Sequence, residues 1–215
     1  MVVDYANFYK RADRTKYIFE KFKKYLGGNV MDVGCDEALL KTMLSPNIKY
    51  TGIDVAGKPD ILLDLEKIER LPFDDSTFDC VICSDVLEHL DNLHFMFSEL
   101  IRVSRGYVIM SWPNAWSGAR VSIWRGEGAF KHYGLPPEKT ADRHKWFFNL
   151  TEAEHFVRCN VAKNDALELV EERITEKPRL AVLRAIRRLR YPQRQRYLNR
   201  YAHTLWTVFR KNVRG

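Results

Sequence analysis

Between residues 29 and 113, short β-branched segments alternate with amphipathic helical patterns, and the links between them are short. Strands are predicted at 29–33, 50–55, 61–65, 78–84 and 107–111, and helices at 37–44 and 91–104. Such alternation is typical of a parallel sheet with helices on both faces. The run at 78–84 is apolar almost throughout, as expected for a parallel strand buried on both sides. The sequence therefore predicts a doubly wound α/β fold, whose ligands bind at the carboxyl ends of the strands.

The chain on either side of this segment extends the same architecture. Helical spacing predicts a helix at 15–26, and the capping box formed by Thr151 and Glu154 predicts the start of another. Alternating apolar residues predict two strands at 167–175 and 203–209, which we expect to pair in antiparallel fashion. We therefore expect one domain over the whole chain, built on a mostly parallel, Rossmann-like seven-stranded sheet whose last strand is antiparallel.

Charge is distributed unevenly along the chain. All 28 acidic residues lie at or before Glu176, whereas residues 177–215 contain 12 Lys and Arg and no acidic residue. Residues 1–176 therefore carry a net charge of −5 (23 − 28), and the last 39 residues carry +12. Anionic partners are thus expected at the carboxyl-terminal segment rather than at the body.

Residues 177–200 are expected to form a basic helical insert between the last two strands. Leu183, Ile186 and Leu189 recur at helical spacing among eight arginines. The first expectation is that this apolar stripe packs on the acidic body while the arginines are solvated. Peripheral contact with an anionic membrane is the second expectation, and contact with nucleic acid, which we consider unlikely, is the third.

A second insert is expected at 114–148, where no clear periodicity is found and Trp, Gly, His and Pro are frequent. It follows a predicted strand at the carboxyl edge of the sheet, so we expect a lid over an acceptor site. Trp112, Trp116 and Trp124 either line an aromatic acceptor pocket or anchor the insert on the sheet.

The composition excludes several classes of protein. Aromatic residues make up 13% of the 215 residues, which excludes a disordered or low-complexity chain. No apolar run approaches the roughly 18 residues of a membrane span, and the first residues lack the apolar core of a secretion signal. Four cysteines do not form a disulfide framework. We expect a soluble, cytoplasmic protein, with peripheral contact to the inner membrane surface as an extension.

Acidic residues follow three predicted strands in an order that suits a nucleoside ligand. The first strand runs into Asp32-Val-Gly34, where glycine lets a ligand approach the backbone at the start of a helix. Asp54 ends the second strand twenty residues later, where a carboxylate can accept both ribose hydroxyls. Asp64 closes the third strand, where it can accept an adenine amino proton. Together these positions predict a nucleoside-containing cofactor.

These residues resemble the class I S-adenosylmethionine-dependent methyltransferases, and most closely the small-molecule branch that includes quinone- and sugar-modifying enzymes. The resemblance runs from about Val30 to Pro113. Its most specific part is the segment from Leu71 to Leu90, which is similar to the LPF…FD…VLEH signature of that family. The resemblance implies the Rossmann-like methyltransferase fold, S-adenosylmethionine as cofactor and methyl transfer as the activity.

Carried over position by position, the resemblance implies a set of cofactor-binding residues. They are Asp32, Gly34, Cys35, Asp54, Val55, Asp64, Leu65, Ser84 and Asp85. Asp36 and Ala38 stand where the family usually has glycine. An aspartate beside the methionyl moiety attracts its ammonium group and repels its carboxylate.

Methyl transfer from a sulfonium is an in-line displacement, so the protein mainly aligns the nucleophile and removes its proton. His144 is the preferred candidate for the base, with Asp142 as the residue that orients it, and His89 and His132 are alternatives. Each histidine can equally be a loop or surface residue. No metal site is predicted, because Cys80 and Cys83 lie three apart on a strand and point to opposite faces.

The sequence leaves three functions open. The first is methyl transfer to a small molecule or to a glycan or lipid-linked acceptor. The second is RNA modification with the basic segment holding phosphates. The third is a non-catalytic module that binds S-adenosylmethionine. The acceptor and the oligomeric state are not determined by the sequence.

Overall fold

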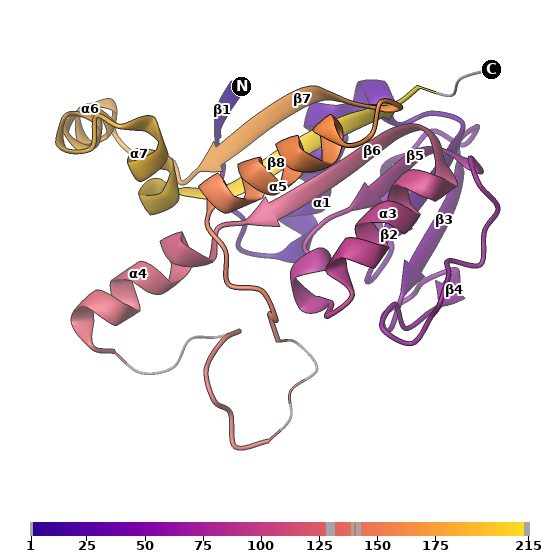
Figure 1. Ribbon diagram of the computed structural model, residues 1–215, viewed down its shortest axis with the longest axis horizontal. Helices are drawn as coiled ribbons and strands as arrows, with labels where there is room; N and C mark the ends of the chain where they lie inside the picture. The colour runs from indigo at the N-terminus through magenta and orange to yellow at the C-terminus, as the bar shows by residue number, and fades with distance from the viewer. Residues whose placement is uncertain (1, 128–131, 139, 141–142, 213–215) are drawn as a thin grey trace.

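The computed structural model describes residues 2–127, 132–138, 140 and 143–212. Its centre is a sheet of eight strands in the order β1-β7-β8-β6-β5-β2-β3-β4 (Figure 1). The strands are β1 (Val2–Tyr5), β2 (Asn29–Val33), β3 (Lys49–Asp54), β4 (Ile61–Leu62), β5 (Phe78–Cys83), β6 (Ser104–Pro113), β7 (Leu167–Glu176) and β8 (Ala202–Lys211). The predicted doubly wound α/β fold is confirmed.

Only β8 runs against its neighbours; it pairs in antiparallel fashion with both β6 and β7, and every other pair is parallel. The register sets Val33 opposite both Ile53 and Cys83, so β2, β3 and β5 end at the same edge. Residues that follow these three strands are therefore brought together.

The sheet has eight strands rather than the predicted seven, because β1 adds a parallel strand beside β7. Four residues are too few to show an alternating pattern in the sequence. The added strand is held by Asp4, which forms an ion pair with Arg173 at 2.7 Å and accepts a hydrogen bond from the Tyr17 hydroxyl at 2.7 Å. Long-range contacts, rather than local preference, fix this edge.

Helices cover both faces of the sheet. They are α1 (Arg11–Phe22), α2 (Leu39–Met43), α3 (Leu93–Val103), α4 (Ala115–Arg125), α5 (Leu150–Ala162), α6 (Ala181–Arg190) and α7 (Arg194–Tyr201), with short 3₁₀ turns η1 (Lys23–Tyr25) and η2 (Leu87–His89). One buried cluster packs α1 and α2 against the sheet through Phe22, Leu40 and Trp206. A larger cluster packs α3 and α5 on the other face.

Two local expectations need correction. Helix α5 is capped by Asn149, whose side chain and that of Glu152 form the capping box, so Thr151 lies inside the helix. Residues 115–125, where the sequence showed no clear periodicity, form α4, capped by the side chain of Asn114. The buried positions of α4 are Ala115 and Ala119, and its large apolar residues are exposed, so no stripe of large apolar residues marks the helix in the sequence.

Helices α6 and α7 connect the end of β7 to the start of β8, and α4 follows the end of β6. All three helices therefore lie toward the edge of the sheet where the parallel strands end, and they gather at the left in Figure 1. Among the described residues, no helix has both the length and the apolar content needed to cross a bilayer.

Candidate functional site at the carboxyl edge of the sheet

The turn after β2 requires glycine at position 34. Gly34 adopts a φ of +76°, and a Cβ atom there would lie 2.3 Å from Cγ2 of Val86. Its backbone N–H donates to the carbonyl of Ile53 at 2.8 Å, which fixes the turn on the end of β3. The turn therefore closes tightly against the residues that follow both β3 and β5.

Asp54, the last residue of β3, is held by backbone donors. Its Oδ2 accepts from the N–H of Asp36 at 2.8 Å, and its Oδ1 accepts from the N–H of Val55 at 2.6 Å. These bonds orient the carboxylate beside the turn after β2, and a carboxylate has further lone pairs with which to accept ligand hydroxyls. The structure thus brings Asp54 and the Gly34 turn together.

Asp32 lies inside the sheet beside this turn. Burial raises the pKa of Asp32 to about 7, although the Tyr50 hydroxyl donates to its Oδ2 at 2.8 Å and counteracts the rise. Burial raises the pKa of Cys35 to about 12, with Asp32 and Asp54 adding to the effect. Cys35 is therefore a neutral thiol in the wall of the site.

The end of β5 supplies Ser84 and Asp85, and Ser111 of β6 ties them together. The Ser111 hydroxyl donates to Oδ1 of Asp85 at 2.8 Å and accepts from the Asp85 N–H at 2.8 Å. Oγ of Ser84 lies 3.3 Å from Oγ of Ser111. Asp85 has a φ of +53°, in the left-handed region that residues other than glycine rarely adopt.

Two arginines of α1 reach this edge, and the sequence analysis missed both. Arg14 forms an ion pair with Asp85, and Arg11 forms one with Asp36 at 3.4 Å. Nothing in the local sequence separates these two from other exposed basic residues of a helix. They provide positive charge beside Asp36 and Asp85, where the sequence alone indicated only negative side chains.

The third predicted acid lies closer to solvent. Asp64 forms an ion pair with Lys67 at 2.8 Å and accepts from the Glu66 N–H at 3.1 Å, and its hydrogen bond with Lys67 holds its pKa below the usual value. Leu65 is buried in the core, whereas Val55 is exposed. Both follow strand ends on the side of the sheet where Asp54 lies.

Three histidines form a cluster that includes His89, which follows Asp85 by four residues. The rings of His89 and His144, far apart in the sequence, have centroids 4.5 Å apart, and His132 stacks on His144 at 4.6 Å. The Tyr133 hydroxyl lies 2.8 Å from Nδ1 of His144. The structure thus joins the two preferred candidate bases in one place, while Asp142 lies outside the described residues.

Hydrogen bonds to backbone carbonyls of residues 88 and 90 hold the end of the insert against this cluster. The N–H of Lys145 donates to the carbonyl of Glu88 at 2.8 Å, and the indole N–H of Trp146 donates to the carbonyl of Leu90 at 2.7 Å. Lys145 also bridges Glu66 and Asp91 through its ammonium group. Residues 143–146 are therefore attached to the segment that follows β5.

The same cluster could hold a metal ion, which the sequence analysis did not predict. Glu88, which is 1% exposed, offers a carboxylate oxygen within 4.8 Å of a ring nitrogen of His89 and one of His144. Mixed imidazole and carboxylate ligands suit first-row divalent cations. The cysteines offer no such set: Cys80 and Cys83 are buried in different core clusters.

The three tryptophans do not form one pocket. Trp112 is buried, and its indole N–H donates to Oγ1 of Thr207 at 3.0 Å, so it is part of the core. Trp116 and Trp124 lie on α4, and both are exposed. Neither tryptophan of α4 anchors the insert on the sheet.

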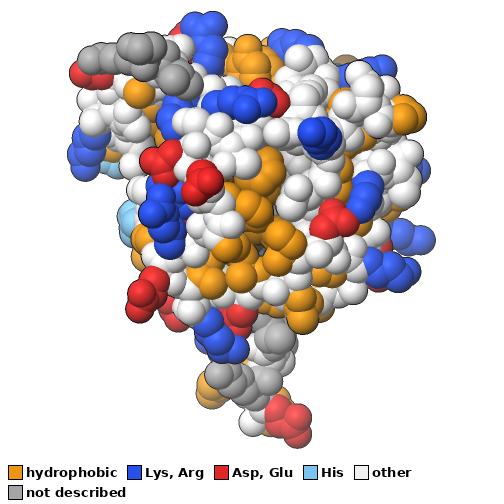
Figure 2. All heavy atoms as spheres, turned by 90° about the vertical axis from the view of Figure 1, so that its right-hand side faces the viewer, with side chains coloured by type: hydrophobic (Ala, Val, Ile, Leu, Met, Phe, Trp, Pro, Cys, Tyr) orange, Lys and Arg blue, Asp and Glu red, His pale blue; other side chains and the backbone are white. Residues whose placement is uncertain are grey.

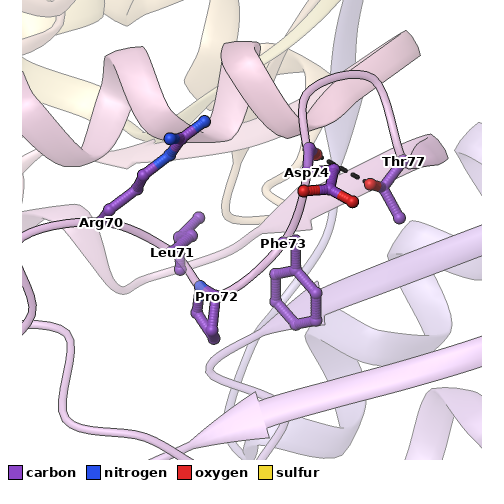
Figure 3. A pocket seen from close by; sticks show the side chains of 6 residues that line it. All are labelled: Arg70, Leu71, Pro72, Phe73, Asp74 and Thr77. Carbon is purple, nitrogen blue, oxygen red and sulfur yellow. Dashed lines mark hydrogen bonds between the residues drawn. The ribbon is translucent and has the colours of Figure 1, made fainter.

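A shallow pocket exists elsewhere on the molecule. It is lined by Arg70, Leu71, Pro72, Phe73, Asp74 and Thr77, and its loop is closed by a hydrogen bond from Oγ1 of Thr77 to the carbonyl of Asp74 at 2.7 Å (Figure 3). These residues precede β5, so the pocket lies at the amino-terminal edge of the sheet. It is therefore separate from the candidate site.

Comparison with known proteins agrees with this geometry. A family model described as a methyltransferase domain matches residues 31–110, the segment that runs from β2 into β6. It contains Asp32, Gly34, Asp54 and Asp85, and it ends just before Ser111.

Two relatives are ubiquinone biosynthesis O-methyltransferases. The one from Vibrio cholerae is 26% identical over 150 residues, and the one from Vibrio campbellii is 29% identical over 151 residues. Each alignment covers 62% of this chain, and it covers 60% and 63% of the two relatives. The chain thus spans less than two thirds of the length of these relatives.

Solved structures share the fold. A small RNA methyltransferase aligns with a TM-score of 0.57 at 13% identity, covering 97% of this chain and 26% of that chain. A magnesium protoporphyrin IX methyltransferase from Synechocystis with bound SAH aligns with a TM-score of 0.52 at 18% identity, covering 95% and 89%.

The match to a methyltransferase domain over residues 31–110 and the fold shared with these solved methyltransferases support a class I S-adenosylmethionine-dependent methyltransferase, with S-adenosylmethionine as the cofactor. The resemblance inferred from the sequence, including that to the small-molecule branch, is confirmed.

Proposed function

We propose that this protein binds S-adenosylmethionine at the carboxyl ends of β2, β3 and β5 and transfers its methyl group to an oxygen atom of a small molecule. The observation that carries the proposal is the convergence of the Gly34 turn, Asp54 and Asp85 at one edge, inside the segment that matches a methyltransferase domain. The names of the relatives support an oxygen acceptor.

The candidate residues contact different parts of the cofactor in this proposal. Asp54, oriented by backbone donors, accepts the ribose hydroxyls, while Val55, Asp64 and Leu65 lie on the adenine side. Asp32, Gly34, Cys35, Ser84 and Asp85 form the wall on the methionine side. Arg14 and Arg11 then offer a cationic partner for the methionine carboxylate, which offsets the repulsion expected from Asp36.

The cofactor supplies a methyl group on a positively charged leaving group. The chain's own task is to hold the acceptor in line and to take its proton. His89 and His144 lie side by side just beyond Asp85, so either imidazole can take the proton of an acceptor hydroxyl. Tyr133 orients His144 through the contact with Nδ1.

Residues 114–148 are proposed to cover the acceptor. The attachment of the described end of this insert to the segment after β5 supports a position over the edge where the methyl group would be presented. A quinone precursor, a lipid-linked molecule or a glycan precursor are the acceptor classes to test, and the relatives favour the first.

Calorimetry with S-adenosylmethionine and its demethylated product tests cofactor binding directly. Methyl-labelled cofactor is then incubated with three acceptor sets: phenolic quinone precursors, a lipid extract and small RNA. Label in a phenolic product supports the proposal. Label only in RNA replaces it with RNA modification, and binding without transfer to any set favours a non-catalytic module.

A further inference from the structure

The apolar side of α6 faces solvent. Five residues at and before this helix are exposed: Leu180, Val182, Leu183, Ile186 and Leu189, which we name the α6 stripe. Leu189 is 82% exposed and Ile186 is 54% exposed, and no residue of α6 is buried. The expectation that this stripe packs on the body is therefore wrong.

The cationic side of the same helix faces the protein. The guanidinium of Arg184 lies 4.2 Å from the ring centroid of Tyr5, and that of Arg187 lies 4.5 Å from the centroid of Tyr201. Such cation–π contacts stabilise a helix in a defined orientation. The helix thus turns its apolar side outward because its arginines find aromatic partners on the body.

A buried carboxylate reinforces that orientation. Glu176, at the end of β7, is 2% exposed and accepts from the Tyr197 hydroxyl at 3.0 Å. Burial raises its pKa, while the charges of Arg188, Arg187 and Arg184 oppose the rise. The inward arginines are therefore attracted by a fixed acid beneath α6.

The surroundings of the stripe are positively charged. Residues 177–200 contain eight arginines and one lysine with no acidic residue, and Arg188, Arg190 and Arg196 are exposed. By contrast, the face turned toward the viewer in Figure 2 carries both signs of charge around its hydrophobic side chains. An exposed apolar stripe in a segment whose only charged residues are cationic matches a surface that is apolar inside and anionic outside.

We propose that the α6 stripe binds in the headgroup region of an anionic lipid bilayer, with the surrounding arginines on lipid phosphates. An amphipathic helix that lies in the plane of the interface has this arrangement, and arginine side chains can extend to the phosphates beside it. A helix of about 15 Å offers too little apolar area for a stable protein interface on its own, but it suits peripheral binding.

The position of α6 gives this contact a function. Helix α6 follows the carboxyl end of β7, at the same edge of the sheet as Asp54 and Asp85 (Figure 1). A protein bound through α6 presents this edge to the membrane side, where a lipid-dissolved acceptor is concentrated. This last step rests on the proposed function, whereas membrane binding itself does not.

Co-sedimentation with vesicles tests the proposal on the full chain. Phosphatidylglycerol–phosphatidylcholine vesicles are compared with pure phosphatidylcholine vesicles at low and high salt. The wild type should bind the anionic vesicles and lose affinity with salt. Leu183→Asp combined with Ile186→Asp should weaken binding about tenfold or more, and Arg190→Gln combined with Arg196→Gln should weaken it only at low salt.

Matched controls come from exposed positions on helices away from α6. Phe95 of α3 is 37% exposed, and Phe95→Asp should bind vesicles as the wild type does, as should Lys163→Gln at the end of α5. Circular dichroism and calorimetry with S-adenosylmethionine should be unchanged in all variants, so that failure of membrane binding is separated from failure of the proposed function.

Three results would overturn the proposal. The first is equal binding of neutral and anionic vesicles at low salt. The second is vesicle binding by the Leu183→Asp/Ile186→Asp variant at wild-type strength. The third is a wild-type dimer, seen by light scattering, that this variant converts to a monomer, because the stripe would then be covered by a second copy of the chain.

Discussion

The inner region, residues 29–113, and the outer region, formed by α4, α6, α7 and residues 143–149, follow opposite rules. In the inner region apolar side chains fill the core, and charges are paired between elements, as in Arg105 with Asp79 at 2.7 Å. In the outer region Trp124 and Leu189 are both 82% exposed, and several arginines contact tyrosine rings. The apolar side chains of the inner region are largely buried against each other, whereas the outer region leaves large apolar side chains exposed to solvent.

The difference separates two tasks. The inner region holds the proposed cofactor site on strand ends that neighbouring strands fix in register. The outer region contacts the inner region through His144, whose ring lies against that of His89, while the α6 stripe faces solvent. Variants in the two regions should therefore separate cofactor affinity from turnover and from surface binding.

The largest expected effect is on turnover. Changing His89 and His144 together to Asn should lower methyl transfer by about 10²- to 10⁴-fold, because the group that takes the acceptor proton is lost. Cofactor affinity, measured by calorimetry, should stay as in the wild type. His155→Asn on α5 serves as the control.

The same double variant shows whether the two histidines act as a base or as ligands of a metal ion. Turnover that depends on added divalent cation, and is abolished by a chelator, would assign the Glu88, His89 and His144 group to metal binding. Turnover insensitive to chelators, with a pH dependence lost in the double variant, would assign it to proton transfer. Unchanged turnover in the double variant would exclude both histidines from the chemistry.

The second effect concerns cofactor affinity alone. Asp54→Ala should weaken S-adenosylmethionine binding by roughly 10²- to 10³-fold, because each lost hydrogen bond to the carboxylate is worth about 1.5–3 kcal/mol. Glu69→Ala, an exposed acid that precedes β5, is the matched control. Calorimetry measures both, and equal affinity in the two variants would contradict the proposed site.

The third effect is on stability and its pH dependence. Since burial raises the pKa of Asp32 to about 7, the ligand-free fold binds the Asp32 proton more tightly than the unfolded chain does. The contribution of Asp32 to the free energy of unfolding is present below about pH 4 and is lost as pH rises toward 7, by roughly 1.4 kcal/mol per unit. Between pH 5 and 7 the loss should reach about 2 kcal/mol.

Asp32→Asn should remove this contribution, so its unfolding free energy should fall less over the same interval. Denaturant titrations of both proteins at pH 5, 6, 7 and 8 measure the difference. Asp75→Asn, which alters an exposed acid at the amino-terminal edge, should leave the pH dependence above pH 5 intact. Parallel curves for wild type and Asp32→Asn would contradict the assignment.

The smallest effect tests the turn itself. Ala38 has a φ of +51°, where an L-residue is strained by about 1–2 kcal/mol and glycine is not. Ala38→Gly should therefore stabilise the fold by about 0.5 kcal/mol after the entropic cost of glycine. Ala185→Gly within α6 should instead destabilise by up to about 1 kcal/mol, and thermal melts of both compare the signs.

Much of the inner region follows from the sequence. The strand at 29–33 has the predicted bounds, β5 ends one residue earlier than predicted, and α3 begins two residues later and ends one residue earlier. The positions of Gly34, Asp54 and Asp85 at strand ends also follow, because strand ends are marked by glycine and acidic residues next to apolar runs. These signals lie in consecutive residues, so they can be recognised in the sequence without knowing which distant segments contact them.

Other features depend on contacts between distant segments. The sequence lists His89 and His144 as separate candidates, and only the hydrogen bonds between residues 145–146 and 88–90 bring their rings together. Arg14 forms its ion pair with Asp85 only because α1 packs beside the residues that follow β5. No periodicity in these segments predicts the contact between His89 and His144 or the ion pair between Arg14 and Asp85.

Helix α6 shows the limit most clearly. Its sequence specifies an apolar side and a cationic side, and that pattern is the same whichever side faces inward. The packing partners decide the orientation: Tyr5, Tyr201 and the buried Glu176 stabilise arginine, so the apolar side is left outside. The sequence by itself determined strands β2, β3 and β5, helix α3 and the strand-end acids, whereas the tertiary structure added β1 to the sheet and decided which surfaces the helices bury and which they offer.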